Sequence, residues 1–140
     1  MDRILGLDVG DKYIGVAVSD LLQITAQGLK TIERVGKNKD IEAIGKIIDD
    51  YDVKKIVVGL PKNMNGSLGP QSEKYMKFGE RIKDKLNIDV IYVDERMTTI
   101  SAERILIQGN VRRENRKKHI DKIAASFILQ AYLDSKGRSN

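Results

Sequence analysis

The chain has 140 residues, no cysteine, no tryptophan and a formal net charge of +5. This length suits a single domain over residues 1–140 with a core that needs no disulfide, and 41% hydrophobic residues exclude wholesale disorder. The lack of cysteine excludes thiol catalysis and cysteine–metal clusters, and the lack of long apolar runs or a leader pattern predicts a cytoplasmic protein with no membrane partner.

The order of apolar patterns along the chain predicts a mixed α/β fold. A short Gly10-Asp11 turn between two β-branched segments indicates an antiparallel hairpin, and Pro70 suits the first turn of a helix. The expected strands cover about 3–9, 12–19, 25–33, 53–60 and 88–93, and the expected helices about 40–51, 70–86, 98–108 and 120–133. Asn38 or Asp40 would cap the helix at 40–51. Three strands in a meander, followed by alternating helices and strands, predict a mixed five-stranded sheet with helices on both faces.

Two stripes of apolar residues in the expected helices are predicted to lie in the core. They are Ile41, Ile44 and Ile48, and Ile123, Phe127 and Ala131.

Asp8 is the first candidate for chemistry, because an ionised carboxylate in an apolar strand is costly unless it is paired, hydrogen-bonded or metal-bound. If Val9 pairs with Lys12 across the turn, Asp8 shares a face with Gly6 and with Tyr13, Gly15 and Ala17 of the next strand. The small residues of this set would leave open space around the carboxylate. The alternative is that Asp8 only ends a strand and accepts bonds from turn amides.

Two further acids stand at positions that suit a shared site. Glu95 follows a buried strand at its carboxyl end, where ligands bind in open α/β sheets, although a solvated strand end paired with Arg96 is the alternative. Asp121 is expected near the start of the last helix, with Ala124 and Ala125 on the same face. Such a helix can approach a sheet closely, and the alternative role for Asp121 is to complement the helix dipole.

The excess positive charge lies in the last third of the chain. Residues 96–140 hold ten Lys/Arg against four Asp/Glu, and the run at 112–118 is the densest part. Clustered Lys/Arg favour a polyanionic partner, whereas a solvated loop is the bland alternative. Three carboxylates beside such a segment suit Mg²⁺ or Mn²⁺, as one or two ions, acting on phosphodiester bonds.

Four sequence blocks together form a specific pattern. The first block is GLDVGDK at 6–12 with IGVAVSD at 14–20. The others are GLP at 59–61 with MNG at 64–66, DER at 94–96 with TT at 98–99 and AE at 102–103, and DKIAA at 121–125 with IL at 128–129. These blocks resemble the YqgF (RuvX) family, which is described as Holliday-junction resolvases and as nucleases that mature the 16S ribosomal RNA precursor. The resemblance spans essentially the whole chain and departs from the family pattern at Tyr13 and Met97.

The resemblance implies an RNase H-like fold of the RuvC type and metal-dependent nuclease activity. It places the catalytic and metal-binding acids at Asp8, Glu95 and Asp121. Its substrate would be a ribosomal RNA precursor or branched DNA, bound by a monomer or homodimer. The residues expected to contact phosphate are Lys12, Arg96, Arg112, Arg113, Arg116, Lys117 and Lys118.

Two other classes of protein stay open at this point. One is a non-catalytic nucleic-acid-binding module linked to transcription, which the retention of all three acids disfavours. The other is a phosphotransferase of the actin and sugar-kinase type, whose ATP site also opens with a strand-borne Asp and a glycine turn. The chain length disfavours the second class, because such kinases need two lobes.

Overall fold

The computed structural model describes residues 2–61, 68–94 and 113–138, with side chains at 122–136 in the last segment. Its strands are β1 (Arg3–Val9), β2 (Tyr13–Ser19), β3 (Ala26–Glu33), β4 (Val53–Leu60) and β5 (Asp89–Asp94). Its helices are α1 (Lys37–Tyr51), α2 (Pro70–Leu86) and α4 (Arg113–Arg138). The expected helix at 98–108 lies outside the described residues.

In the described part of the chain, five strands form one mixed sheet in the order β3-β2-β1-β4-β5. The strands β1, β2 and β3 form an antiparallel meander, and β1, β4 and β5 are parallel. The predicted fold class is confirmed, and the short turn and the β-branched content of residues 3–19 explain why the hairpin forms at the centre.

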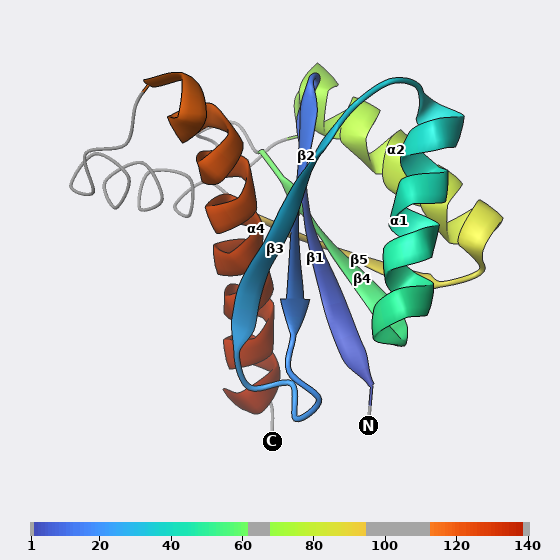
Figure 1. Cartoon of the computed structure of the whole chain (residues 1–140). Helices are drawn as coiled ribbons and strands as arrows, with labels where there is room; N and C mark the ends of the chain where they lie inside the picture. Colours follow the sequence, from blue (N-terminus) through green and yellow to red (C-terminus); the bar gives the residue numbers. More distant parts are fainter. Residues whose placement is uncertain (1, 62–67, 95–112, 139–140) are drawn as a thin grey trace.

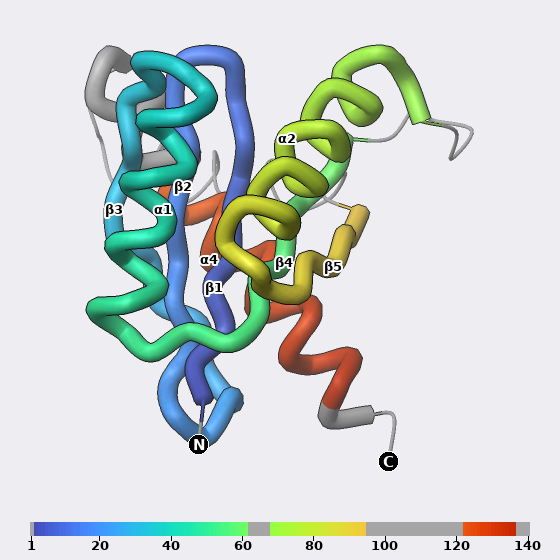
Figure 2. The backbone as a smooth tube through the Cα atoms, turned by 90° about the vertical axis from the view of Figure 1, so that its right-hand side faces the viewer, coloured from blue at the N-terminus to red at the C-terminus, as the bar shows by residue number. Residues whose placement is uncertain are grey.

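Helices cover both faces of this sheet. Figure 1 shows α4 on one side and α1 with α2 on the other, and Figure 2 shows the same layers after a quarter turn. The side chains of Leu5, Leu7 and Val9 in β1 pack towards α1 and α2, whereas Ile4 packs towards α4. The period of two along a strand therefore divides β1 between two cores.

The first of the two predicted core stripes is confirmed and the second is wrong. Ile41 and Ile44 are buried in α1, and Ile48 is partly buried and packs against the same core. In α4, however, Ala131 is exposed and Ile123 and Phe127 are only partly buried. The buried residues of α4 are instead Ala124, Ala125, Ile128, Leu129 and Leu133. At Gly6 of β1, the helix meets the sheet through Ala125 and Leu129.

Two expected helix starts are also corrected. The last helix begins at Arg113 rather than near residue 120, so the basic run at 113–118 is helical and not a loop. This segment is rich in Arg, Lys and Glu, which are good helix formers. α1 begins at Lys37 after Gly36, whose left-handed φ of 153° suits glycine, and no side chain caps its amides. Asp40 lies in the first turn and accepts a bond from the amide of Val35 (3.1 Å). Within the described residues, no helix is long and apolar enough to cross a membrane.

Candidate functional site

Asp8 is the next-to-last residue of the central strand β1 and is partly buried. It lies opposite Gly15 of β2, and Gly6 lies opposite Ala17, so these residues share one face of the sheet. The pairing differs from the expected one, since Val9 pairs with Ile14 and not with Lys12. Because the two registers differ by two residues, the expected face is still correct.

The helix α4 approaches the sheet closely at Gly6. A Cβ atom on Gly6 would lie 2.8 Å from the Cβ of Leu129 and 3.0 Å from the carbonyl oxygen of Ala125. The expected open space near Asp8 is therefore absent at Gly6, where the backbone of α4 takes its place. A glycine is required here because a close approach of two backbones leaves no room for a side chain.

This contact sets the level of Asp121 along the sheet. Two contacts show that α4 runs antiparallel to β3. The amide of Ala26 in β3 donates to the side chain of Gln130, and a Cβ on Gly28, further along β3, would lie beside Lys122, which comes earlier in α4. Since β1 is parallel to β3, α4 also runs antiparallel to β1.

From Gly6, one step of two residues along β1 reaches Asp8, about 6.6 Å away. From Ala125, one helical turn towards the start of α4 reaches Asp121, about 6 Å away and in the same direction. The backbone of Asp121 therefore lies on the Asp8 side of the contact between Gly6 and Ala125. Since α4 begins at Arg113, Asp121 stands more than two turns inside the helix, and a role in complementing the N-terminal dipole is excluded.

The third expected acid follows the end of β5. Asp94 is the last residue of this strand and pairs with Leu60, while the preceding Val93 packs in the core beneath α4. Glu95, Arg96 and Arg112 lie outside the described residues.

The predicted phosphate contacts divide into two places. Lys12 is exposed in the turn between β1 and β2. The residues Arg113, Arg116, Lys117 and Lys118 lie in the first turns of α4. Figure 1 shows the start of α4 and this turn at the same end of the molecule, away from both termini. The cationic part of the helix therefore lies at the end of the sheet that carries Asp8.

The structure adds a charged pair at the turn that sequence reasoning missed. Asp11 bonds to the ammonium of Lys74 (2.9 Å) and lies 3.2 Å from the side-chain amide of Gln71, both from α2. The hydrogen bonds from Lys74 and Gln71 hold the pKa of Asp11 below its usual value. The contact joins residues 63 positions apart, and no local spacing in the sequence indicates it.

Comparison with known proteins identifies the family. A family model described as "RuvX: Holliday junction resolvase" matches residues 2–135. This chain belongs to the RuvX family. The resemblance seen in the sequence blocks is thereby confirmed.

Relatives in this family are similar to the chain over nearly their whole length. A protein of Clostridioides difficile is 62% identical over 134 residues, 96% of this chain and 95% of that protein. A protein of Caldanaerobacter subterraneus is 57% identical over 138 residues, 98% of this chain and 99% of that protein. Both carry the name "Putative pre-16S rRNA nuclease".

Solved structures of resolvases share the fold of this RuvX protein. Thermus thermophilus RuvC in complex with a Holliday junction substrate has a TM-score of 0.61 at 11% identity, over 98% of this chain and 97% of that one. The fowlpox virus Holliday junction resolvase has a TM-score of 0.55 at 17% identity, over 95% and 99% of the two chains. At these identities the likeness concerns the fold, which is the expected RuvC type.

Proposed function

We propose that this RuvX protein is a Mg²⁺- or Mn²⁺-dependent endonuclease that hydrolyses phosphodiester bonds in structured nucleic acid. Asp8, Glu95 and Asp121 are its catalytic and metal-binding residues. The observation that supports the proposal is the close contact of α4 with β1 at Gly6, because Asp121 lies one helical turn from Ala125, on the side towards Asp8.

The residues fit a hard divalent cation. Asp8 carries its carboxylate at a partly buried position of β1, opposite the small residue Gly15. Carboxylates are the ligands that Mg²⁺ and Mn²⁺ prefer, usually together with water and substrate phosphate. When bound, one or two such ions supply an activated water and charge stabilisation for the leaving oxygen.

The protein's own cations hold the substrate. Lys12 and Arg96 contact phosphate, and the basic residues Arg112, Arg113, Arg116, Lys117 and Lys118 hold the nucleic-acid backbone. The names of the relatives favour a precursor of 16S ribosomal RNA as substrate, and the family description favours a four-way DNA junction. Both present closely spaced phosphates in an unusual shape, which suits a cationic helix next to a small acidic site.

The test is cleavage of both substrates side by side with Mn²⁺, Mg²⁺ or a chelator. Asp8→Asn should abolish cutting while the protein stays folded, and Asp89→Asn, an exposed acid at the opposite end of the parallel strands, is the matched control. Full activity of Asp8→Asn would refute the assignment. Tight binding by the wild type without cutting, with both metals tried, would instead support a non-catalytic binding module.

The role of the cationic helix has a separate test in the salt dependence of binding. Changing Arg113, Arg116 and Lys117 to Gln should lower the slope of log affinity against log salt by about one for each lost contact. Changing the exposed Lys39, Lys46 and Lys83 to Gln removes the same charge from α1 and α2. If both triple variants show the same slope, the start of α4 is not the interface.

A further inference from the structure

The arginine that follows β3 makes an unusual set of contacts. The backbone amide of Arg34 donates to the carbonyl oxygen of Lys12 (2.8 Å), and its Nη1 donates to the carbonyl oxygen of Gly10 (3.0 Å). Its Nε donates to Asp40 (3.0 Å), and its Cζ lies 4.6 Å from the centre of the Phe78 ring. One side chain thus joins the β1–β2 turn to both helices on the face opposite α4.

We propose that Arg34 is a positioning residue of the active site, which fixes the Gly10–Lys12 turn and through it the end of β1 that carries Asp8. This inference rests on the proposed function of Asp8. Arg34 does not touch the face of the sheet where Asp8 lies, so it acts through the backbone of the turn.

The turn needs such support because the strand pairing stops before it. The ladder between β1 and β2 ends with Val9 opposite Ile14, and inside the turn Gly10 donates to the carbonyl of Tyr13 (2.8 Å). Arg34 donates hydrogen bonds to the carbonyl oxygens of Gly10 and Lys12, the two neighbours of Asp11. Since Asp8 is only two residues from Gly10, a shift of the turn moves the carboxylate as well.

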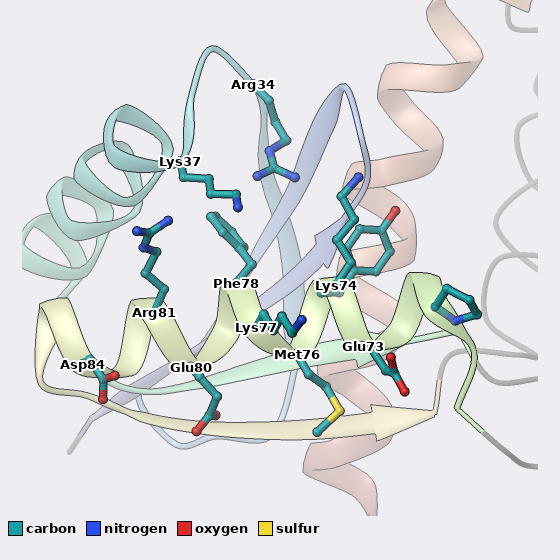
Figure 3. A pocket seen from close by; sticks show the side chains of 12 residues that line it. Arg34, Lys37, Glu73, Lys74, Met76, Lys77, Phe78, Glu80, Arg81 and Asp84 are labelled. Carbon is teal, nitrogen blue, oxygen red and sulfur yellow. The ribbon is translucent and has the colours of Figure 1, made fainter.

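The guanidinium is itself held in place. Asp40 is 1% exposed and the Arg34 side chain 13% exposed, so this ion pair is shielded from water. Figure 3 shows Arg34 descending from the end of β3 towards Phe78 of α2, with Lys37 of α1 beside it. A planar guanidinium bonds Asp40 and the carbonyl of Gly10 at once and stacks on the ring, whereas a lysine ammonium cannot reproduce this fork.

The consequence for catalysis is a sharp dependence on this residue. Reacting groups displaced by about 1 Å can lose about a hundredfold in rate, even when the change lies far from the chemistry. Arg34→Lys keeps the charge and should lower kcat by about 10- to 100-fold with little change in KM. The Mn²⁺ concentration for half-maximal effect should rise several-fold.

Two controls separate positioning from loss of stability. Ile82→Val removes a methyl group from the same buried core without removing a polar contact, so it shows how activity responds to a lower Tm alone. Arg34→Ala with added guanidinium ion tests for rescue, since the small cation can refill the site between Asp40 and the turn. If Arg34 were only structural, Arg34→Lys would behave like Ile82→Val. Its Tm would fall, but at temperatures where the protein is still folded its kcat and its Mn²⁺ midpoint would equal those of the wild type.

Binding of Mn²⁺ followed by broadening of the Asp8 amide signal gives a readout that needs no cleavage. A wild type that binds Mn²⁺ beside Asp8 but cuts neither substrate would refute the nuclease proposal, and a raised midpoint in Arg34→Lys would still support the positioning role. An unchanged midpoint and kcat in Arg34→Lys would overturn the inference about Arg34. Absence of broadening near Asp8 in the wild type would overturn both.

Discussion

Substitution of Gly6 by alanine tests the packing that brings α4 to the central strand. The new Cβ would lie 2.8 Å from the Cβ of Leu129 and 3.0 Å from the carbonyl of Ala125, and neither atom belongs to the far end of a flexible chain. Relief therefore requires α4 and β1 to move apart.

The expected cost follows from two opposing effects. Forcing an extra methyl group into a packed core costs about 1–3 kcal/mol. Replacing glycine by alanine restricts the unfolded chain and returns about 0.4–1 kcal/mol. We expect the free energy of unfolding to fall by about 1–2 kcal/mol, which corresponds to a Tm lower by about 3–7 °C for a chain of this size.

Gly28→Ala in β3 is the control at a second contact with the same helix. Its Cβ would lie 2.8 Å from the Cγ and 3.4 Å from the carbonyl oxygen of Lys122, and the Lys122 side chain can rotate away, so Tm should fall less than in Gly6→Ala. Differential scanning calorimetry measures both variants. Cleavage well below Tm should also fall in Gly6→Ala, because α4 carries Asp121. Equal Tm values for the two variants would refute the close-contact explanation.

Three further predictions concern charges and hydroxyls. Asp40→Asn should lower the free energy of unfolding in urea by about 3 kcal/mol, because it leaves the shielded Arg34 without its ionic partner. Lys74→Gln should raise the pKa of Asp11 in a carboxyl NMR titration. In the wild type, the stability that the Asp11–Lys74 pair contributes should be present above about pH 4 and be lost as the pH falls through the lowered pKa of Asp11 in the folded state.

Burial and the bond to a carboxylate raise the pKa of Tyr92 well above 10, so the stability that the Tyr92 hydroxyl contributes should be lost as the pH rises above about 10. Tyr92→Phe removes this hydroxyl and should therefore flatten the decline of stability in that range.

Each of these has a direct control. Asp49→Asn changes an exposed acid of the same helix as Asp40 and should cost almost nothing, and an equal loss in both would argue against a buried pair. Lys77→Gln removes a charge from α2 and should leave the Asp11 titration unchanged. For Tyr92, an alkaline profile in the Phe variant identical to wild type would show that its bond to Glu80 (2.6 Å) does not matter.

The sequence predicted the sheet because its signals are local. The helix from Pro70 to Leu86 and the strand from Val53 to Leu60 are found with the expected bounds, since proline, glycine and apolar periodicity mark them. The hairpin register was wrong by two residues, because turn length depends on contacts that Gly10 makes with Tyr13 in space. The face of Asp8 was nevertheless correct, since an even shift preserves alternation.

The errors in α4 have a different cause. Apolar residues occur around much of this helix, so periodicity alone allowed a stripe through Phe127 as well as one through Leu129. The choice depends on the partner surface, and Gly6, which has no side chain, receives the face of α4 that carries Ala125 and Leu129. The contacts of Arg34 were equally invisible, because they join segments that become neighbours only after folding.

The central strand is thus fixed from both sides around one carboxylate. On one face, the absence of a side chain at Gly6 sets how deeply α4 lies, and with it the level of Asp121. On the other, Arg34 and Lys74 hold the turn that ends the strand. Stability and activity should therefore be coupled at these positions and separable at Ile82, which is equally buried but lies outside this chain of contacts. A RuvX protein of this kind would then lose activity from small displacements of β1 before it loses its fold.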